Sequence, residues 1–161
     1  MRILGIDPGT ATIGYGVVDT VNGKNIVVSY GVITTSPKKS DSKRLLDIYC
    51  DTNTIISEFN PDSVAIERLF FARNITTAIA VAKASGVINL AVVQRSIPVI
   101  EYTPMEVKQA VVGYGNAEKK QVQYMIKRLL DLKETPKPDD AADALAIAIC
   151  HAHSMKLKTL K

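Results

Sequence analysis

Cysteine is scarce in this sequence, and the features of membrane and exported proteins are missing. The two cysteines, Cys50 and Cys150, lie far apart and belong to no C-x-x-C or Cys/His pattern, so we predict reduced, packed thiols without a disulfide or a zinc site. No stretch approaches the roughly 20 uncharged apolar residues that a membrane-spanning helix needs. The first residues, MRILGID, run directly into a strand pattern and do not have a signal-peptide layout. We therefore expect a cytoplasmic protein.

Internal repeats, low-complexity tracts and linkers are also absent from the sequence. The 161 residues are 47% hydrophobic, which is enough to bury one sizeable core, so residues 1–161 are expected to form a single domain. The formal net charge of +4 favours a polyanionic partner without identifying one. Basic residues cluster near 38–44, 119–128 and 156–161, and solvated surface charge is the simplest interpretation of the first and last clusters.

The order of strand and helix patterns predicts an α/β fold. Three β-favouring runs begin the chain, and Asn22-Gly23 between the second and third is a strong hairpin signal. Two further short apolar runs alternate with helical patterns, which predicts a mixed sheet of three antiparallel strands followed by parallel strands, with helices packed on the sheet. The expected strands cover residues 2–7, 13–19, 26–34, 63–67 and 97–102, and the expected helices cover 40–59, 74–94, 104–111, 118–130 and 140–153.

Acidic residues stand at the ends of two expected strands and on the last helix. Asp7 ends the first strand and Glu67 ends the fourth, and if these strands are parallel neighbours, both carboxylates emerge at the carboxyl edge of the sheet. Asp143 lies among alanine, leucine and isoleucine on an otherwise apolar helix, where aspartate is unfavourable. Either Asp139 or Asp140 can share a helix face with Asp143, so the spacing leaves both open as its partner.

Each of these acids also has an ordinary structural explanation. Asp7 could brace the PGT turn, and the acids of PDD could cap the last helix. Glu67 could pair with Arg68 or Arg73. Several carboxylates at one sheet edge would nevertheless repel one another unless a cation neutralised them, and clustered oxygen ligands suit Mg²⁺ or Mn²⁺. Because two such ions about 3.5 to 4 Å apart can cleave a phosphodiester, an acidic pocket in a basic protein favours a nuclease.

Several sequence blocks, spread over nearly the whole chain, occur together in one known family. In their order and separation they closely resemble the RuvC family of Holliday-junction resolvases, which have a ribonuclease H-like fold. The blocks are GIDPGT with GYGVVD, then IERLFFARN, VKQAVVGYGNAEK and DDAADALAIAICHAH.

The resemblance implies the site residues, cofactors and partners. The family's metal-binding catalytic carboxylates match Asp7, Glu67, Asp140 and Asp143, and the family pattern DAAD selects Asp140 over Asp139. The implied enzyme is an endonuclease that resolves four-way DNA junctions by paired symmetric strand cuts in recombination and repair. It requires divalent metal, with two Mg²⁺ ions per site and Mn²⁺ as a substitute. The family acts as a homodimer and partners a branch-migration motor.

Two lysines, one phenylalanine and one arginine are candidates for handling DNA. Lys108 and Lys119 match family positions near the scissile phosphate, where an ammonium group offsets charge and positions the phosphate. Phe70 matches the family's base-stacking wedge, and stacking on an unpaired base is worth about 1 to 3 kcal/mol. Core packing is the default interpretation of Phe71, whereas Arg73 is a candidate contact to the DNA backbone.

Two helices carry further predictions. Small residues at Ala78, Ala82 and Gly86 make the helix over 74–94 our hypothesis for the dimer interface, although the helix could instead only cover the sheet. His151 and His153 do not share a face and are interpreted as helix-end histidines.

Three other functions fit part of the pattern. GIDPGT also resembles the phosphate loop of the actin, Hsp70 and sugar-kinase ATPases, but those proteins need a second lobe for which this chain has no room. A module that binds branched DNA without cutting it is disfavoured by the four intact acids. A ribonuclease H-like nuclease acting on RNA is the closest rival, and the Phe70 wedge and the VVGYGNAEK block favour junctions over it.

Overall fold

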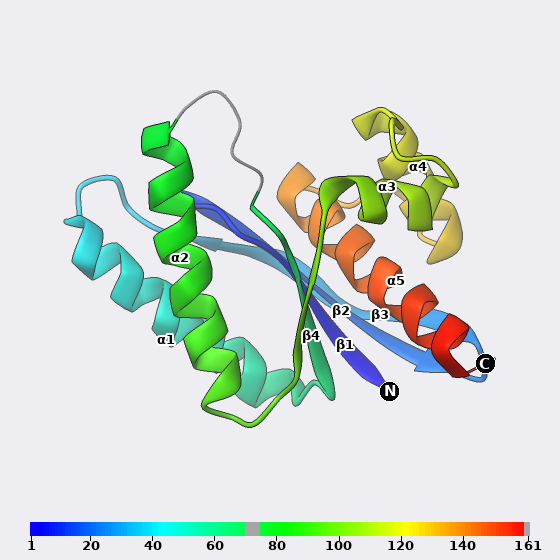
Figure 1. Cartoon of the computed structure of the whole chain (residues 1–161), viewed down its shortest axis with the longest axis horizontal. Helices are drawn as coiled ribbons and strands as arrows, with labels where there is room; N and C mark the ends of the chain where they lie inside the picture. The colour runs from blue at the N-terminus through cyan, green and yellow to red at the C-terminus, as the bar shows by residue number, and fades with distance from the viewer. Residues whose placement is uncertain (70–74, 160–161) are drawn as a thin grey trace.

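Three antiparallel strands begin the chain, as the sequence predicts (Figure 1). The computed structural model describes residues 1–69 and 75–159, and in these residues five strands form one mixed sheet in the order β3-β2-β1-β4-β5. The strands are β1 (Arg2–Asp7), β2 (Thr12–Val21), β3 (Lys24–Thr34), β4 (Ser63–Glu67) and β5 (Val99–Tyr102). The helices are α1 (Asp41–Phe59), α2 (Ile75–Val93), α3 (Pro104–Val112), α4 (Lys119–Leu129) and α5 (Asp139–Thr159).

The sheet is antiparallel on one side of β1 and parallel on the other. β2 and β3 form a hairpin in which Asn22 and Gly23 have φ angles of 51° and 75°, the two positive values that a type I′ turn requires. β1 pairs parallel with β4, and β4 pairs parallel with β5. Parallel neighbours need long crossovers, and α1 and α2 provide them. The predicted α/β architecture is confirmed.

Helices cover both faces of the sheet. Figure 1 shows α1 and α2 on one side and α5 on the other, with α3 and α4 beyond α5. The first face is an apolar layer in which Leu4, Ile6 and Ile66 pack with side chains of α1 and α2. On the second face, Ile3 and Ala65 pack with the alanine-rich α5 and with α3 and α4. Because side chains alternate along a strand, residues 3, 5 and 7 of β1 all point toward α5.

The last helix is longer than predicted, and neither His151 nor His153 is a helix-end residue. α5 begins at Asp139 and continues to Thr159, so His151 lies inside the helix and is only 1% exposed. Its Nε2 lies 3.0 Å from Ser63 Oγ and its Nδ1 lies 2.9 Å from the Tyr102 hydroxyl. The interpretation of both as helix-end histidines is therefore wrong. The His151 ring joins α5 to the first residue of β4 and the last residue of β5 through buried hydrogen bonds, and His153 Nδ1 lies 3.0 Å from the Ala110 carbonyl oxygen of α3.

The apolar composition of α2 corrects an expectation about membrane spans. By length and composition α2 is apolar enough to cross a membrane, with a mean hydropathy of 1.6, although only 22% of that stretch is buried inside the structure. α2 therefore corrects the expectation that no stretch of the chain approaches the composition of a membrane span.

The cysteines differ in exposure. Cys150 is buried, as predicted for a packed thiol, and burial raises the pKa of its thiol to about 12, but Cys50 is exposed. Both cysteines are free.

Candidate active site

Asp7 and Glu67 end two neighbouring parallel strands on the face that α5 covers. The register pairs Ile6 of β1 with Ile66 of β4, so Asp7 and Glu67 follow directly at the carboxyl edge of the sheet. Since both isoleucines point toward α1 and α2, both acids point toward α5. Within residues 1–69 and 75–159, the Asp7 carboxylate has no hydrogen-bond partner, so a turn-bracing role is not supported.

Glycines on the same face let α5 approach the sheet backbone. Gly14 is the cross-strand partner of Asp7, and a side chain on Gly14 would overlap the carbonyl oxygen of Asp140. A side chain on Gly5 would likewise overlap the carbonyl oxygen of Ala144. The first turns of α5 therefore lie directly against the ends of β1 and β2. Sequence reasoning missed these glycines, although GYG within the second strand was a signal that a backbone approaches closely.

A cavity of about 250 Å³ opens where the strand ends meet the helices. Three of the four predicted acids line it together with both predicted phosphate-binding lysines, whereas Asp140 is not among the lining residues. The lining residues are Asp7, Glu67, Pro104, Val107, Lys108, Lys119, Val122, Asp143 and Ala146. Acids from β1, β4 and α5 thus share one hollow with lysines from α3 and α4.

The carboxylates of this cavity resist ionisation. Burial raises the pKa of Asp7 to about 8, and the negative charges of Glu67, Asp143 and Asp140 add to this effect in that order. Burial also raises the pKa of Glu67, with a further contribution from Asp143, while Lys108 and Lys119 oppose the shift. The pKa of Asp143 is raised by burial and lowered in part by its hydrogen bond with Lys119. The site therefore concentrates more negative charge than its two lysines neutralise.

The shifted pKa of Asp7 predicts how the stability of the metal-free protein depends on pH. Its folded-state pKa of about 8 lies above its usual 3.8, so the folded state holds a proton that the unfolded chain loses between these values. The stability contributed by this proton is complete below pH 3.8 and is lost as the pH rises through 8. We expect Asp7→Asn to raise the free energy of unfolding on the order of 3 kcal/mol at pH 8 and hardly at pH 4.

Urea unfolding of both proteins at several pH values in EDTA measures this difference. The free energy of unfolding of the wild type is subtracted from that of Asp7→Asn at each pH. This removes the opposite pH dependence that Asp19 and Glu106 give to both proteins, because Arg2 lowers the pKa of Asp19 and hydrogen bonds from Thr103 lower that of Glu106. A stability difference that does not change between pH 4 and pH 8 would contradict the assigned burial and repulsion at Asp7.

Lys119 reaches into the site from the first turn of α4. Its Nζ lies 2.9 Å from Asp143 Oδ2 and 3.4 Å from Asp139 Oδ2, and these partners raise its pKa. Asp139 Oδ1 also accepts a hydrogen bond from Gln123, another α4 residue, at 2.9 Å. Asp139 thus joins α4 to the start of α5, and its side chain is 62% exposed, compared with 31% for Asp143.

Lys108 is positioned by the start of α3. Thr103 and Glu106 form a capping box in which Thr103 Oγ1 accepts from the Glu106 backbone at 3.2 Å and the Thr103 backbone donates to Glu106 Oε2 at 2.7 Å. This cap, with Pro104 in the first turn, fixes the helix one turn before Lys108. Arg68 pairs with Glu101 at 3.4 Å, so it does not pair with Glu67 as one alternative required.

The chemistry of the acids fits a hard divalent cation. The candidate ligands are carboxylate oxygens, which Mg²⁺ and Mn²⁺ prefer, and burial followed by mutual repulsion raises their pKa values, effects that a bound cation would oppose. In the part of the chain that the structure describes, no three Asp, Glu, His or Cys side chains are already arranged to hold an ion together. The carboxylates therefore lie farther apart in this structure than a shared ion would require.

Two predicted DNA-contacting residues, Phe70 and Arg73, lie outside the described residues, as does Phe71. Their assigned roles remain predictions.

Gly14→Ala tests whether the close approach of α5 matters to the site. The added methyl group would push the start of α5 away from β2, and a misplacement of about 1 Å at a catalytic group can cost on the order of 10²-fold in rate. We expect cleavage of a four-way junction to slow by roughly 10- to 100-fold, measured under single-turnover conditions. Gly16→Ala is the comparison, because its methyl group would meet the Leu145 side chain and backbone one turn farther along α5. An unchanged cleavage rate for Gly14→Ala would contradict the role of Gly14, and equal slowing of both variants would show that the approach of α5 matters along both turns.

Comparison with known proteins agrees with this site. The family described as "Crossover junction endodeoxyribonuclease RuvC" matches residues 3–151. A protein of that name from Alkaliphilus metalliredigens is 56% identical over 160 residues, covering 99% of this chain and 98% of the relative. The structure titled "Thermus thermophilus RuvC structure" has a TM-score of 0.92 at 38% identity, and one titled "T. thermophilus RuvC in complex with Holliday junction substrate" has 0.90 at 36%. Each covers 99% of this chain and 98% of the neighbour.

These matches extend over nearly the whole chain and include every block that carried the resemblance. They confirm the predicted ribonuclease H-like fold class as well as the predicted family. The chain therefore belongs to the RuvC family of crossover junction endodeoxyribonucleases.

Proposed function

We propose that this chain resolves four-way DNA junctions by hydrolysing phosphodiesters at an acid cluster formed by Asp7, Glu67, Asp140 and Asp143. Membership of the family makes the chain a crossover junction endodeoxyribonuclease. The observation that carries the assignment of the site is the cavity in which three of these acids meet Lys108 and Lys119. A relative of 36% identity and nearly the same fold has been solved in complex with a Holliday junction substrate.

The acid cluster would bind the divalent metal. Two Mg²⁺ ions, or Mn²⁺ in their place, would supply an activated water and stabilise the oxygen that leaves the phosphodiester. Asp7 and Glu67 are held by the rigid ends of paired strands, whereas Asp140 and Asp143 are held by a helix packed on glycine. These supports hold the backbone positions of the four acids close together despite the repulsion between their carboxylates.

The two lysines would hold the scissile phosphate. Both line the cavity, on the side formed by α3 and α4, opposite the strand ends. Lys119 now donates to Asp143, and once that carboxylate binds metal, its ammonium becomes available to a phosphate oxygen. We keep the proposals that Phe70 stacks on an unpaired base at the junction and that Arg73 contacts the DNA backbone.

The test is cleavage of a synthetic four-way junction and of a duplex with the same arm sequences, with and without Mg²⁺. We expect paired, symmetric cuts in the junction, only with Mg²⁺, and no cuts in the duplex. Mg²⁺ should also raise the thermal unfolding midpoint, because a ligand that binds the folded state alone stabilises it. Equal cutting of duplex and junction would contradict the proposed specificity.

We also propose that two copies act together, because matched cuts in two strands need two acid clusters. α2 has an exposed apolar stripe along one face, made of residues three or four positions apart. Ile75, Ile79, Leu90 and Val93 are 73%, 50%, 53% and 61% exposed, with Ala82 and Gly86 between them. The buried residues of α2, Ala84, Ile88, Ala91 and Val92, lie on the opposite face against the sheet.

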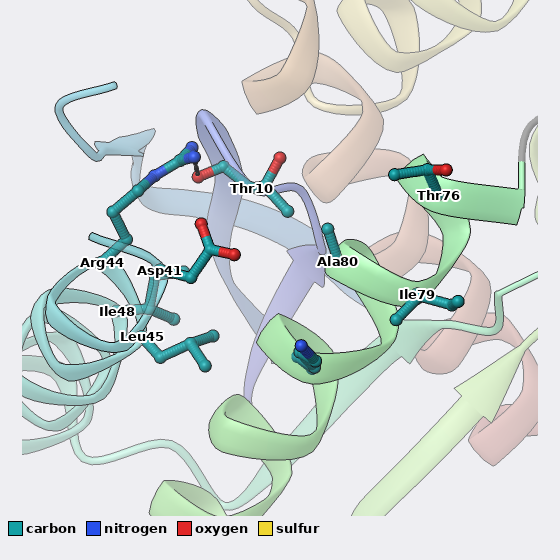
Figure 2. Close-up of a pocket in the computed structure, with 9 residues that line it drawn as sticks. Thr10, Asp41, Arg44, Leu45, Ile48, Thr76, Ile79 and Ala80 are labelled. Carbon is teal, nitrogen blue, oxygen red and sulfur yellow. Dashed lines mark hydrogen bonds between the residues drawn. The ribbon is translucent and has the colours of Figure 1, made fainter. Parts of the chain in front are cut away.

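A hollow beside this stripe strengthens the proposed interface. A cavity of about 220 Å³ lies between α1 and α2. Its lining includes Leu45, Ile48 and Ile79, with charged side chains such as Asp41 and Arg44 at its edge (Figure 2). Ile79 belongs to both the stripe and the cavity, so side chains of a second copy on α2 have an apolar recess to fill. Arg44 closes one end, where it donates to the carbonyl oxygen of Thr10 at 2.7 Å.

Leu90→Glu is expected to dissociate the dimer. A buried charge in the middle of an apolar interface should raise the dissociation constant at least about 30-fold, the cost of a hot-spot residue. Light scattering over a concentration series measures the change. Ile26→Glu is the matched control, because Ile26 is also 53% exposed but lies on the edge strand β3. A wild-type protein that is monomeric on the junction would refute the dimer.

From the family we further propose a cytoplasmic location and a branch-migration motor as partner.

A further inference from the structure

Helix α4 has a basic, aromatic outer face that the acid cluster does not use. Lys120, Tyr124 and Arg128 follow one another at intervals of four residues, and Lys127 lies beside them, so all four share one side of the helix. This set is called the outer strip below. The opposite side of α4 is apolar and packs through Val122 and Ile126 into the core.

Two exposed tyrosines lie on this surface. The Tyr124 side chain is 60% exposed, and Tyr114, in the loop before α4, is 46% exposed. The Tyr114 hydroxyl donates to Gln121 Oε1 at 2.7 Å, which holds its ring beside the outer strip. Tyrosine hydroxyls and basic side chains are both common donors to DNA phosphates. Their combination on one face fits a polyanionic backbone better than an apolar partner.

The charges of the outer strip are not neutralised within the described part of the chain. The ion pairs among residues 1–69 and 75–159 use Arg2, Lys39, Arg68 and Lys119, and none involves Lys120, Lys127 or Arg128. Lys119 pairs with the acids, but its neighbours on the helix do not. The outer strip therefore presents three unpaired cations next to a site that receives a phosphodiester.

The N-terminal end of α4 lies at the acid cluster, and the outer strip runs from that end along the length of the helix. Lys119, at the first residue of α4, lies 2.9 Å from Asp143, and Figure 1 shows α4 on the far side of α5 from the strands. The 11 residues of α4 span roughly 16 Å, which matches about five base pairs of a duplex at about 3.4 Å each. A duplex arm leaving the site along α4 would pass all four residues.

We propose that the outer strip binds the phosphate backbone of the junction arm that leaves the cut site, over about the first five base pairs. This inference rests on the proposed function, since it assumes that a junction occupies the acid cluster. Lys120, Lys127 and Arg128 neutralise phosphates, and the Tyr124 hydroxyl donates to one. Backbone contacts of this kind set the position of the arm without reading its sequence.

The test compares Lys127→Gln/Arg128→Gln with a control of equal charge loss, Lys24→Gln/Lys156→Gln. Lys24 follows the β2–β3 turn, and the Lys156 side chain lies beside Gly23 of that turn, so both are at the other end of the sheet from Asp7. Junction affinity is measured by fluorescence anisotropy between about 50 and 200 mM salt, in EDTA. We expect Lys127→Gln/Arg128→Gln, called the strip variant below, to bind the junction at least about tenfold more weakly than the control. The negative slope of the logarithm of the association constant against the logarithm of the salt concentration should become less steep by about 2.

Two further measurements identify the DNA contact. Tyr124→Phe, which removes only the hydroxyl, should weaken binding roughly 2- to 10-fold. Uncharged methylphosphonate linkages in the first five base pairs beyond the cut should weaken junction binding by the wild type more than binding by Lys127→Gln/Arg128→Gln, because that variant has already lost two of the contacts. Equal affinity and salt slope for strip and control variants would overturn the inference. If the wild type neither binds nor cuts junctions, the proposed function itself fails.

Discussion

Asp7→Asn is expected to abolish junction cleavage while leaving junction binding intact. The substitution keeps the shape of the side chain but removes a charge that the divalent metal requires. Metal-assisted charge stabilisation is worth several kcal/mol, so the single-turnover rate in Mg²⁺ should fall by at least about 10³-fold. The affinity measured in EDTA near neutral pH should stay about the same, because no DNA contact is assigned to Asp7 and its raised pKa leaves little charge on it without metal.

Asp51→Asn is the control for this substitution. Asp51 is an exposed acid on α1, outside the residues that line the site, so its neutralisation should leave the cleavage rate unchanged. If Asp7→Asn loses binding together with cleavage, Asp7 is structural. That result would also conflict with the gain in stability that relief of its burial and repulsion predicts at pH 8.

Asp140→Asn should lose nearly all Mg²⁺-dependent cleavage, whereas Asp139→Asn should keep most of it. Helical spacing alone cannot choose between them, since both can share a face with Asp143. The structure favours Asp140 through Asp7: the Asp140 backbone rests on Gly14 beside Asp7, and of the two acids only Asp140 contributes to the raised pKa of Asp7, whereas both act on Asp143. We expect at least about a 10²-fold loss for Asp140→Asn, in line with loss of a metal ligand.

Asp139 has a different environment. It is more exposed and binds Lys119 and Gln123 of α4, contacts that asparagine can partly retain. Asp139→Asn should therefore cut within a few-fold of wild type and lose at most roughly 1 kcal/mol of stability, because exposed ion pairs contribute little. Both rates come from the same single-turnover assay. An inactive Asp139→Asn beside an active Asp140→Asn would show that the family pattern was transferred one residue out of place.

Several features of this protein could be predicted from the sequence because they depend on local chemistry. Alternating and continuous apolar runs mark each strand to within a few residues, Asn22-Gly23 specifies the turn after the second strand, and Thr103-Pro104 marks the start of α3. Asp7 and Glu67 were identified for the same reason, since an acid that ends an apolar strand is visible in the sequence itself. The blocks around them also identified the family.

The tertiary structure decided how these acids meet. Two strands that each end in an acid form a site only if the acids are level with each other and point to the same face of the sheet. Both conditions depend on the pairing of residues that are far apart in the chain. The close approach of α5 to the sheet is possible because Gly5 and Gly14 have no side chain. The hydrophobic periodicity of the sequence does not reveal this requirement. Lys119 belongs to the site because α4 folds over α5 and brings its ammonium to Asp143.

Burial separated residues that look alike in the sequence. His151 and His153 are two positions apart, yet only His151 is enclosed, because α5 continues past both and turns His151 toward β4 and β5. α2 reads as apolar on every side, and only its packing against the sheet shows which side is free. Sequence periodicity records the direction of each side chain relative to its own helix or strand. What lies in that direction is set by packing between distant segments, and that packing alone assembled the cavity.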